Sequence, residues 1–390
     1  YQRDFGQFRD VKFGVDGRLI TSDDNINQYS SASFNTANLI NRGQNTFQGL
    51  FVTGTYRFDS TPLDVNFGLR QDFYQVSNSS LDGTIYNTKG GATPFGTSLA
   101  NNSYSSLDPS LGLKYYVNDN FDVRGAIYRN FAAPGMNQLY RTFLSGSSLT
   151  IANPYLAPQT NFGQEVGFDL NTTARDANLS VTAFNNQLSN FLDLATMCSS
   201  AAACNPAIAG TGMPPGSVST LRQYVNAGNA TIRGYEILAN AQVHKTLNLT
   251  GGFTQTWAYL TRSDYNSGAN PSDPTNAQLG QVPPWMLQLG AQWQALPDLN
   301  LSAQLQSFPA FWNNTAHTQL NDGATLVNVG FRYQIDKSVQ VYGSIQNLFN
   351  TQYLAQGMTY TTFEGGTVNS ASAPMLGLPR WFTLGVRATF

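Results

Sequence analysis

The chain has 390 residues, of which 11% are charged and 13% are aromatic, and its formal net charge is −2 at pH 7. So few charges, balanced in sign, exclude the global basic field that holds nucleic acid. They also exclude intrinsic disorder, because disordered chains are rich in charge and poor in aromatic residues.

The hydrophobic pattern predicts a chain built almost entirely of β-strands. At the C-terminus every second residue is apolar and the residues between are polar or small, which is the two-residue period of a strand. The apolar set there is Phe382, Leu384, Val386, Ala388 and Phe390. We count roughly fourteen segments of this kind, each about ten residues long, the length that crosses a bilayer at a tilt. No apolar run approaches the ~18 residues that a transmembrane helix needs.

The connections between these segments alternate between short and long. Short links include 59–62, 117–120, 297–298 and 335–338. The long polar connections run near 22–45, 77–106, 131–161, 192–229, 260–284, 308–322 and 350–379. Long loops gathered at one end, with charged residues on the polar strand faces, are typical of a lipid-facing wall around a hydrated lumen. The sequence therefore predicts an all-β fold, a transmembrane antiparallel up-and-down β-barrel.

Five motifs resemble those of TonB-dependent outer-membrane receptors. Phe131–Tyr140 is similar to the family's F-R-A-P-T-x-N-E-L-Y stretch, and Asn153–Thr160 is similar to N-P-x-L-x-P-E-x. Asn226–Glu236 resembles the N-x-G…I-x-G-x-E element, and Gln346–Tyr353 resembles N-L-F-D-x-x-Y. Pro379–Phe390 is similar to the closing strand of the family. The motifs occur in the order that the family has.

The resemblance implies a fold, a location and a function. Family members are 22-stranded barrels with a plugged lumen, so we expect residues 1–390 to be one barrel domain, N-terminally truncated, without plug and first strands. The resemblance implies a monomer in the bacterial outer membrane, surrounded by outer-membrane lipid and driven by the TonB energy-coupling complex. It implies energy-coupled uptake of a scarce ligand, and we expect a ferric siderophore. Cobalamin or an oligosaccharide as ligand, or a passive substrate-specific porin, stay open as alternatives.

Neither a catalytic site nor a metal or cofactor site is predicted. His244 and His317 have no second histidine or carboxylate at metal-like spacing, and no G-x-S-x-G or H-E-x-x-H motif occurs. We therefore expect a transport protein and not an enzyme. A Ser/His/acid enzyme at the cell surface stays open as a third class, because spacing alone does not decide it.

The candidate ligand contacts are aromatic and cationic residues of the long connections. They are Tyr140, Arg141, Phe143, Phe311, Trp312, Tyr360 and Phe363. Rings with one or two cations suit a ferric siderophore, whose complex is usually anionic and rich in rings. A corrinoid or an oligosaccharide would suit such residues almost as well.

Two further predictions concern local features. Cys198 and Cys204 are close enough along the chain to form a disulfide within an external loop, given an oxidising compartment. Phe382, Leu384, Val386 and Phe390 form an apolar stripe that ends in an aromatic residue at the C-terminus. In outer-membrane barrels such a stripe resembles the signal read by the assembly machinery.

Overall fold

The computed structural model describes residues 2–31, 34–86, 91–145, 147–174, 176–207, 218–264, 278–313, 317, 320–357 and 374–389. These residues form one large, almost wholly antiparallel sheet, two small two-stranded ladders and two short helices, α1 (Met136–Leu139) and α2 (Ala201–Ala207). The small ladders pair β16 (Phe311–Trp312) with β17 (Leu320–Asn321), and β20 (Leu354–Gly357) with β21 (Pro374–Leu376). No helix in the described ranges is long and apolar enough to span a membrane.

Fourteen strands make up the body of the large sheet, and each pairs antiparallel with the next of them along the chain. They are β2 (Phe8–Ser31), β3 (Phe34–Arg57), β4 (Leu63–Tyr86), β6 (Asn102–Asn118), β7 (Phe121–Ala132), β10 (Gln159–Asn171), β11 (Ala177–Cys198), β12 (Thr220–His244), β13 (Leu247–Ser263), β14 (Trp285–Leu296), β15 (Leu299–Phe308), β18 (Ala324–Gln334), β19 (Val339–Gln346) and β22 (Trp381–Ala388). Four short strands are added at the margins: β1 (Gln2–Phe5), β5 (Ala92–Ser98), β8 (Phe143–Ser145) and β9 (Ser148–Ile151). The predicted up-and-down fold is confirmed.

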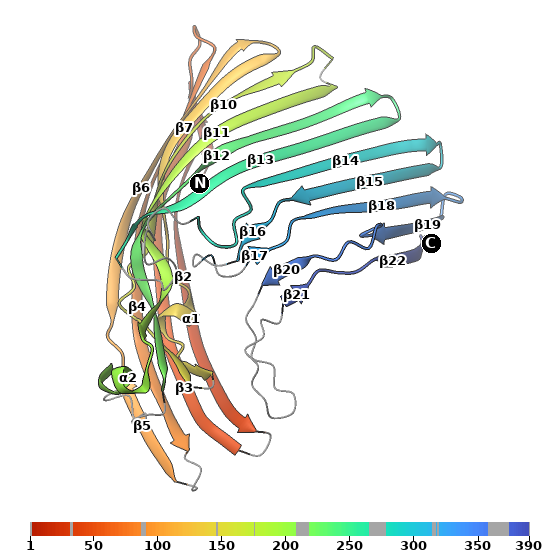
Figure 1. The fold of residues 1–390 in the computed structure, drawn as a ribbon. Coiled ribbons are helices and arrows are strands. Elements are labelled where there is room, and N and C mark those ends of the chain that lie inside the picture. Colours follow the sequence, from red (N-terminus) through yellow and green to blue (C-terminus); the bar gives the residue numbers. More distant parts are fainter. Residues whose placement is uncertain are drawn as a thin grey trace.

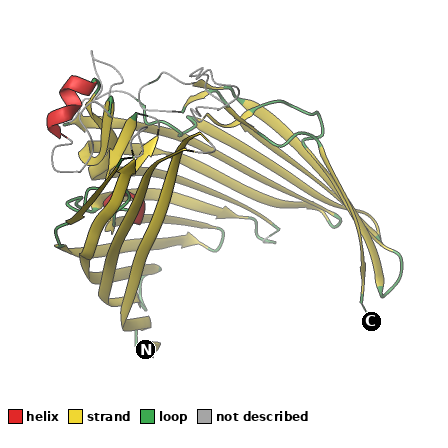
Figure 2. Ribbon diagram, turned by 90° about the horizontal axis from the view of Figure 1, so that it is seen from below, coloured by secondary structure: helices red, strands yellow, loops and turns green. Residues whose placement is uncertain are grey.

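The sheet curves into an open arc, and the two chain ends lie at opposite ends of it (Figures 1 and 2). Among the described residues β22 pairs with β19 alone, while β2 pairs with β3 and, over a few residues, with β1. The described ladders therefore do not join β2 to β22, and the sheet has two open edges.

Tight turns of two residues, at 119–120, 245–246 and 297–298, join strands at one end of the sheet. We call this the short-turn end and the opposite one the long-loop end. We also divide the sheet into an N-terminal wall, β2 to β12, and a C-terminal wall, β13 to β22. Strands of the N-terminal wall reach 24 or 25 residues, whereas β14, β15 and β22 have 12, 10 and 8.

The predicted long loops at 22–45, 77–106 and 192–229 are therefore largely wrong. Most of these residues continue β2, β3, β4, β6, β11 and β12 as long hairpins beyond the region of apolar alternation. Both faces of such an extension contact water or other polar groups, so alternation between apolar and polar residues is no longer required. Backbone pairing continues without the sequence signal that marks a half-buried strand.

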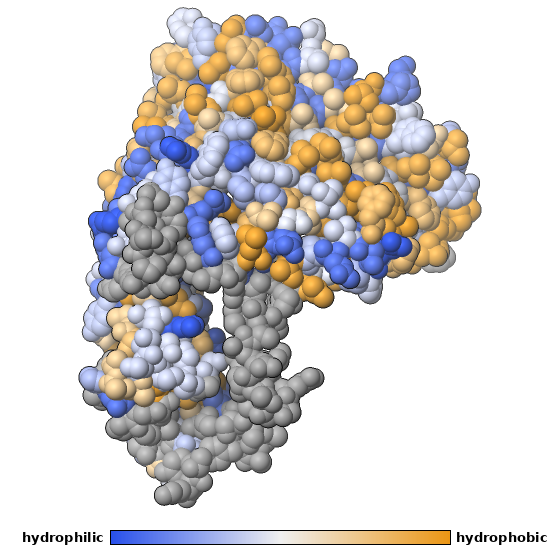
Figure 3. All heavy atoms as spheres, in the orientation of Figure 1, coloured by the Kyte–Doolittle hydropathy of each residue, from blue (hydrophilic) through white to orange (hydrophobic). Residues whose placement is uncertain are grey.

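One face of the sheet is covered by exposed apolar side chains. Val15 and Leu384, on the first and last strands of the body, are each 76% exposed. Other members of this face are Phe13, Leu19, Leu50, Leu69, Leu111, Leu113, Ile127, Val166, Phe331, Phe382 and Val386. In Figure 3 apolar residues gather over the upper body of the sheet, with fewer around β5 and α2 below. An apolar surface of this extent needs lipid or protein against it.

The buried core lies at the long-loop end, where the connection between β7 and β10 folds back inside the arc. We call this connection, residues 133–158, the strap; it contains α1, β8 and β9. Leu139, Tyr140 and Leu156 pack against Tyr74 and Val76 of β4. Leu149 packs against residues of β3 and β12, and β9 runs parallel to the start of β12. The strap is thus part of the inner surface of the wall.

Candidate functional site: the inner face of the sheet

Side-chain amides attach the strap to the wall on two sides. Asn41 of β3 donates to the Thr142 carbonyl (3.2 Å) and accepts from the Thr142 amide (2.8 Å), and both residues are buried. Asn226 of β12 makes the same double contact with the backbone of Ala157, at 2.9 Å for each bond. An asparagine amide offers a donor and an acceptor side by side, so it can replace a strand partner for one residue. The strap is therefore bound to β3 and β12 at once.

The N-x-G motif explains part of this attachment. Gly228, two residues after Asn226, has φ of +145°, and a Cβ there would lie 1.9 Å from the Arg262 carbonyl oxygen. No other residue fits so close to the backbone of β13. Asn226 and Ala157 belong to two different motifs of the sequence, and the structure brings those motifs into direct contact.

On the N-terminal wall, the side chain of Arg70 reaches across β3 to an exposed carboxylate and also pairs with a buried one. Asp16 of β2, Gly49 of β3 and Asp72 of β4 lie in one row across the sheet. Arg70 lies over Gly49 and donates to Asp16 and to Asp72, at 2.7 Å in both cases. A Cβ at position 49 would lie 2.1 Å from Nη2 of Arg70, so glycine makes room for this geometry.

Further ion pairs follow the same wall close to the short-turn end. They are Arg57–Asp64 (2.8 Å), Lys114–Asp122 (3.2 Å) and Arg124–Asp169 (3.2 Å). Asp64 and Asp122 are 6% and 8% exposed. A buried carboxylate is stable when a cation and hydrogen-bond donors compensate for its lost hydration. Asp64, Asp122 and Asp169 thus have their counter-charges within the N-terminal wall.

The strap and these charges share the inner face. A hollow of about 760 Å³ is lined by Arg70 and Asp72 of the wall and by Ala133 and Met136 of the strap. Arg18 also lines it, and its guanidinium lies 4.7 Å from the centre of the Phe47 ring. This hollow combines rings with charged groups just inside the long-loop end.

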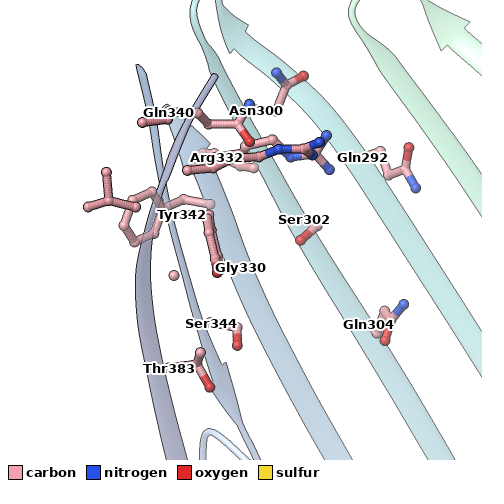
Figure 4. A pocket seen from close by; sticks show the side chains of 16 residues that line it. Gln292, Asn300, Ser302, Gln304, Gly330, Arg332, Gln340, Tyr342, Ser344 and Thr383 are labelled. Atoms are coloured by element: carbon pink, nitrogen blue, oxygen red, sulfur yellow. The ribbon is translucent and has the colours of Figure 1, made fainter. Parts of the chain in front are cut away.

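The C-terminal wall carries a second, more polar hollow of about 1010 Å³ on the same face. Directly opposite residues of an antiparallel ladder share a face. Followed from strand to strand, the ladders place Arg124, Thr182 and Glu236 of the N-terminal wall on the same face of the sheet as Gln292 and Arg332 of the C-terminal wall. The side chains in the hollow are mainly amides, hydroxyls and arginines (Figure 4).

Among the predicted ligand contacts, Tyr140 is placed in the core. It is 1% exposed, its ring fills the space above Gly43, and its hydroxyl lies within hydrogen-bond distance of the Gln44 carbonyl (2.9 Å) and of the Asn45 side chain. Burial raises the pKa of Tyr140 to about 12, so the hydroxyl stays protonated and remains a donor. A side chain so enclosed offers no surface to a ligand, and the prediction for Tyr140 is corrected: the residue packs the strap against the wall.

Arg141 and Phe143 lie together on the strap. The Arg141 guanidinium is 5.0 Å from the centre of the Phe143 ring and 3.3 Å from Asp24 of β2. Arg141 is exposed and Phe143 is half-buried. The pair therefore presents a partly neutralised cation and a ring at the long-loop end.

Phe311 and Trp312 lie in the connection between β15 and β18. Trp312 stacks on His317 with ring centres 4.9 Å apart, and Phe311 contacts Phe308 edge-on. His317, which has no partner at metal-like spacing in the sequence, extends this aromatic surface. Tyr360 and Phe363 lie outside the described residues.

The structure describes the predicted disulfide and most of the predicted C-terminal apolar stripe. Cys198, the last residue of β11, is joined by a disulfide to Cys204 of α2, in the connection between β11 and β12. Phe382, Leu384 and Val386 are 65%, 76% and 66% exposed on the apolar face of β22, while Phe390 lies outside the described residues.

His244 is the last residue of β12, directly before the turn at 245–246, and its Nδ1 is 2.9 Å from the Thr246 hydroxyl. Within the ranges described, no three histidine, cysteine, aspartate or glutamate side chains lie close enough together to hold a metal ion.

Comparison with known proteins identifies the family. The family model described as "TonB dependent receptor-like, beta-barrel" matches residues 1–348. The chain belongs to this family. Members of the TonB-dependent receptor family are outer-membrane transport receptors of Gram-negative bacteria, so the resemblance read from the five motifs is confirmed.

Known relatives are considerably longer than this chain. The ferrienterobactin receptor of Escherichia coli K12 is 22% identical over 287 residues, which cover 68% of this chain and 34% of that receptor. The catecholate siderophore receptor Fiu of the same strain is 20% identical over 348 residues, covering 84% of this chain and 41% of that receptor. The crystal structure of closed Fiu has a TM-score of 0.70 at 18% identity and covers 100% of this chain and 53% of that one, which shows a shared fold. The chain thus spans less than half the length of these two curated relatives.

Proposed function

We propose that the chain forms most of the barrel wall of a TonB-dependent receptor in the bacterial outer membrane. The receptor would take up a ferric siderophore with energy from the TonB complex. The proposal includes additional strands between β2 and β22 and a plug inside the lumen, both supplied by residues that precede position 1. The receptor would act as a monomer surrounded by outer-membrane lipid.

The observation that carries this proposal is the pair of open edges. β2 and β22 are both described, and no described ladder joins them. A lipid-exposed edge at bilayer depth would leave backbone groups without partners, which costs several kcal/mol for each group. A complete fourteen-stranded porin would join these strands, so the open arc favours a larger barrel over a passive pore.

The siderophore assignment rests on the relatives and on the long-loop end. The two curated relatives named above are receptors for ferrienterobactin and for catecholate siderophores. In this chain Arg141 and Phe143, and on another hairpin Phe311 and Trp312, supply a cation and rings that suit an anionic aromatic complex. Tyr360 and Phe363 stay in the proposed set on the sequence pattern alone.

The test uses the full-length protein in a strain that lacks its own catecholate receptors. Uptake of radioactive iron from a ferric catecholate should require both this protein and an intact TonB complex. Replacing Arg141 by Gln together with Phe143 by Ala should lower uptake by about tenfold, since two such contacts commonly supply that much binding energy. Lys337→Gln, in a turn at the short-turn end, is the control.

The alternatives give different results in the same strain. Uptake that persists without TonB would establish a passive pore. TonB-dependent uptake of cobalamin or an oligosaccharide, without uptake of iron, would keep the receptor and replace the ligand.

A further inference from the structure

The outer, apolar face of the sheet carries an arginine where β10, β11, β12 and β13 lie side by side. Directly opposite residues of a ladder share a face, and so do residues two apart on one strand. Val166, a member of the apolar face, is opposite Ala183, and Ala183 is opposite Tyr235. Arg233, two residues before Tyr235, therefore lies on this face too, opposite Asn185 of β11.

Arg233 is exposed and its charge is not neutralised within the described part of the chain. Its guanidinium lies 5.5 Å from the centre of the Tyr259 ring, and no hydrogen bond or ion pair joins it to another described residue. Arg262, farther along β13, differs because it pairs with Asp264 at 2.7 Å. A guanidinium has five N–H donors, so Arg233 can still bind an anion.

The position of Arg233 along its strand corresponds to the far edge of the apolar band. It is ten residues from Val243, which lies near the short-turn end. Ten residues of strand span roughly 33 Å. At a tilt of about 40° they cover about 25 Å along the membrane normal, which is the height of such a band. Tyr235 and Trp257, with ring centres 6.1 Å apart, lie at this level, as aromatic residues of an interface do. Because the short turns of outer-membrane barrels are periplasmic, this is the interface of the outer leaflet.

An apolar hollow of about 520 Å³ lies beside Arg233 on the same face. Its lining includes the side chains of Leu111, Leu113, Ile127 and Val166, together with the amides of Gln164 and Asn185. Gln164 is opposite Asn185, and Asn185 is opposite Arg233, so the hollow begins one strand away from the guanidinium. A cation and two amides next to an apolar hollow match a phosphate that is joined to a hydrocarbon chain. A soluble anion would have no use for the hollow.

We propose that this part of the outer face binds a phosphate-bearing lipid of the outer leaflet. Arg233 and the amides of Gln164 and Asn185 contact the phosphate, and an acyl chain of the same lipid lies in the hollow. A cation that faces lipid costs free energy, and charge-assisted hydrogen bonds to a phosphate offset that cost. The inference rests on the proposed function only where that function places the wall in the outer membrane. It requires neither the TonB complex nor a siderophore.

The experiment titrates the full-length, delipidated protein in dodecyl maltoside micelles with fluorescent lipid A that carries both of its phosphates. Arg233→Gln should raise the Kd by about tenfold, because a hydrogen-bonded contact between charged groups commonly supplies that factor. Arg262→Gln is the matched control, since Arg262 already pairs with Asp264, and it should change the Kd by less than about twofold. Ala183→Phe places a ring in the hollow and should raise the Kd by about fourfold, the effect of one methylene group that is no longer buried.

Heat-modified gel migration checks that each variant is folded before it is compared. An unchanged Kd for Arg233→Gln would overturn the inference, as would equally tight binding of lipid A from which the phosphates have been removed. Displacement of lipid A by inorganic phosphate, with no effect of Ala183→Phe, would assign Arg233 to a soluble anion and would also overturn it. Uptake of iron is measured in parallel and should be the same in Arg233→Gln as in the unaltered protein. Absence of that uptake in the unaltered protein would overturn the proposed receptor and leave the lipid site standing.

Discussion

The two walls of the sheet differ in whether the charged residues on their inner faces form ion pairs. On the N-terminal wall Arg70 crosses over Gly49 to reach the exposed Asp16 and the buried Asp72. On the C-terminal wall Arg332 and Arg387 are exposed without a carboxylate on any neighbouring strand. The first arrangement stabilises the wall by itself, whereas the second leaves both guanidinium groups without an ion pair among the described residues. The inner faces therefore differ in how their charges are paired even though the outer faces are alike.

The largest expected effect tests whether the apolar outer faces of both walls contact lipid. Val15→Arg on the N-terminal wall and Leu384→Arg on the C-terminal wall should each cost about 2–4 kcal/mol of unfolding free energy, because both place a charge in lipid near the midplane. Thr383→Lys, on the inner face beside Leu384, should cost far less. Denaturant unfolding of the protein refolded into lipid vesicles measures all three. Equal costs at positions 383 and 384 would mean that the apolar face does not contact lipid.

The inner faces should respond differently to loss of an arginine. Arg70→Ala should destabilise the protein by about 2 kcal/mol, because it leaves Asp16 and Asp72 close together without a cation. Arg332→Ala should change stability by less than about 0.5 kcal/mol, since it removes no ion pair within the wall. The same unfolding measurement applies. As a control, Arg70→Gln with Asp16→Asn and Asp72→Asn should recover part of the loss.

A local effect should distinguish the strap-covered end from the rest of the sheet. Gly43→Ala should cost about 1–2 kcal/mol, because the new methyl group overlaps the Tyr140 ring at 2.4 Å. Gly251→Ala is the matched control, since its Cβ would be 3.6 Å from Leu289, an ordinary contact. Hydrogen exchange should show faster opening of the strap in the first variant only. Unchanged exchange there would place Tyr140 elsewhere.

The smallest effect concerns Asp193, a carboxylate of the N-terminal wall that lies beyond the bulges of β11, outside the membrane-spanning part. Burial raises the pKa of Asp193 above its ordinary value, against the opposing hydrogen bond from the Leu194 amide. The folded state then holds this proton more tightly than the unfolded state, so its contribution to stability is lost as pH rises through the raised pKa.

Asp193→Asn should therefore stabilise the protein by less than about 1 kcal/mol at pH 7, with the gain disappearing below the ordinary pKa of about 4. Denaturant unfolding from pH 3.5 to pH 7 measures the difference. A gain in stability that is the same at every pH would show that the folded protein offsets the burial of the Asp193 carboxylate.

How far the sequence allowed prediction depended on whether a feature is local. The terminal stripe around Leu384 was read directly, because alternation within eight residues reports one lipid-facing side. For the hairpin extensions of β2, β3, β11 and β12 the sequence predicts loops, because strands with two polar faces lose that alternation. The sequence predicts a ligand contact at Tyr140, because nothing near it in the chain reveals that Gly43 leaves space for its ring.

The sequence by itself determined the number of strands in the body of the sheet, the apolar side of those strands that alternate, and the family. These follow from short-range periodicity and from motifs, which are contained in neighbouring residues. Only the tertiary structure decided which charges are paired. Arg70 and Asp16 are 54 positions apart, and Asn41 and Thr142 are 101 apart. Such contacts depend on the register of several ladders together, and register is a property of the assembled sheet because each strand is positioned by both its neighbours.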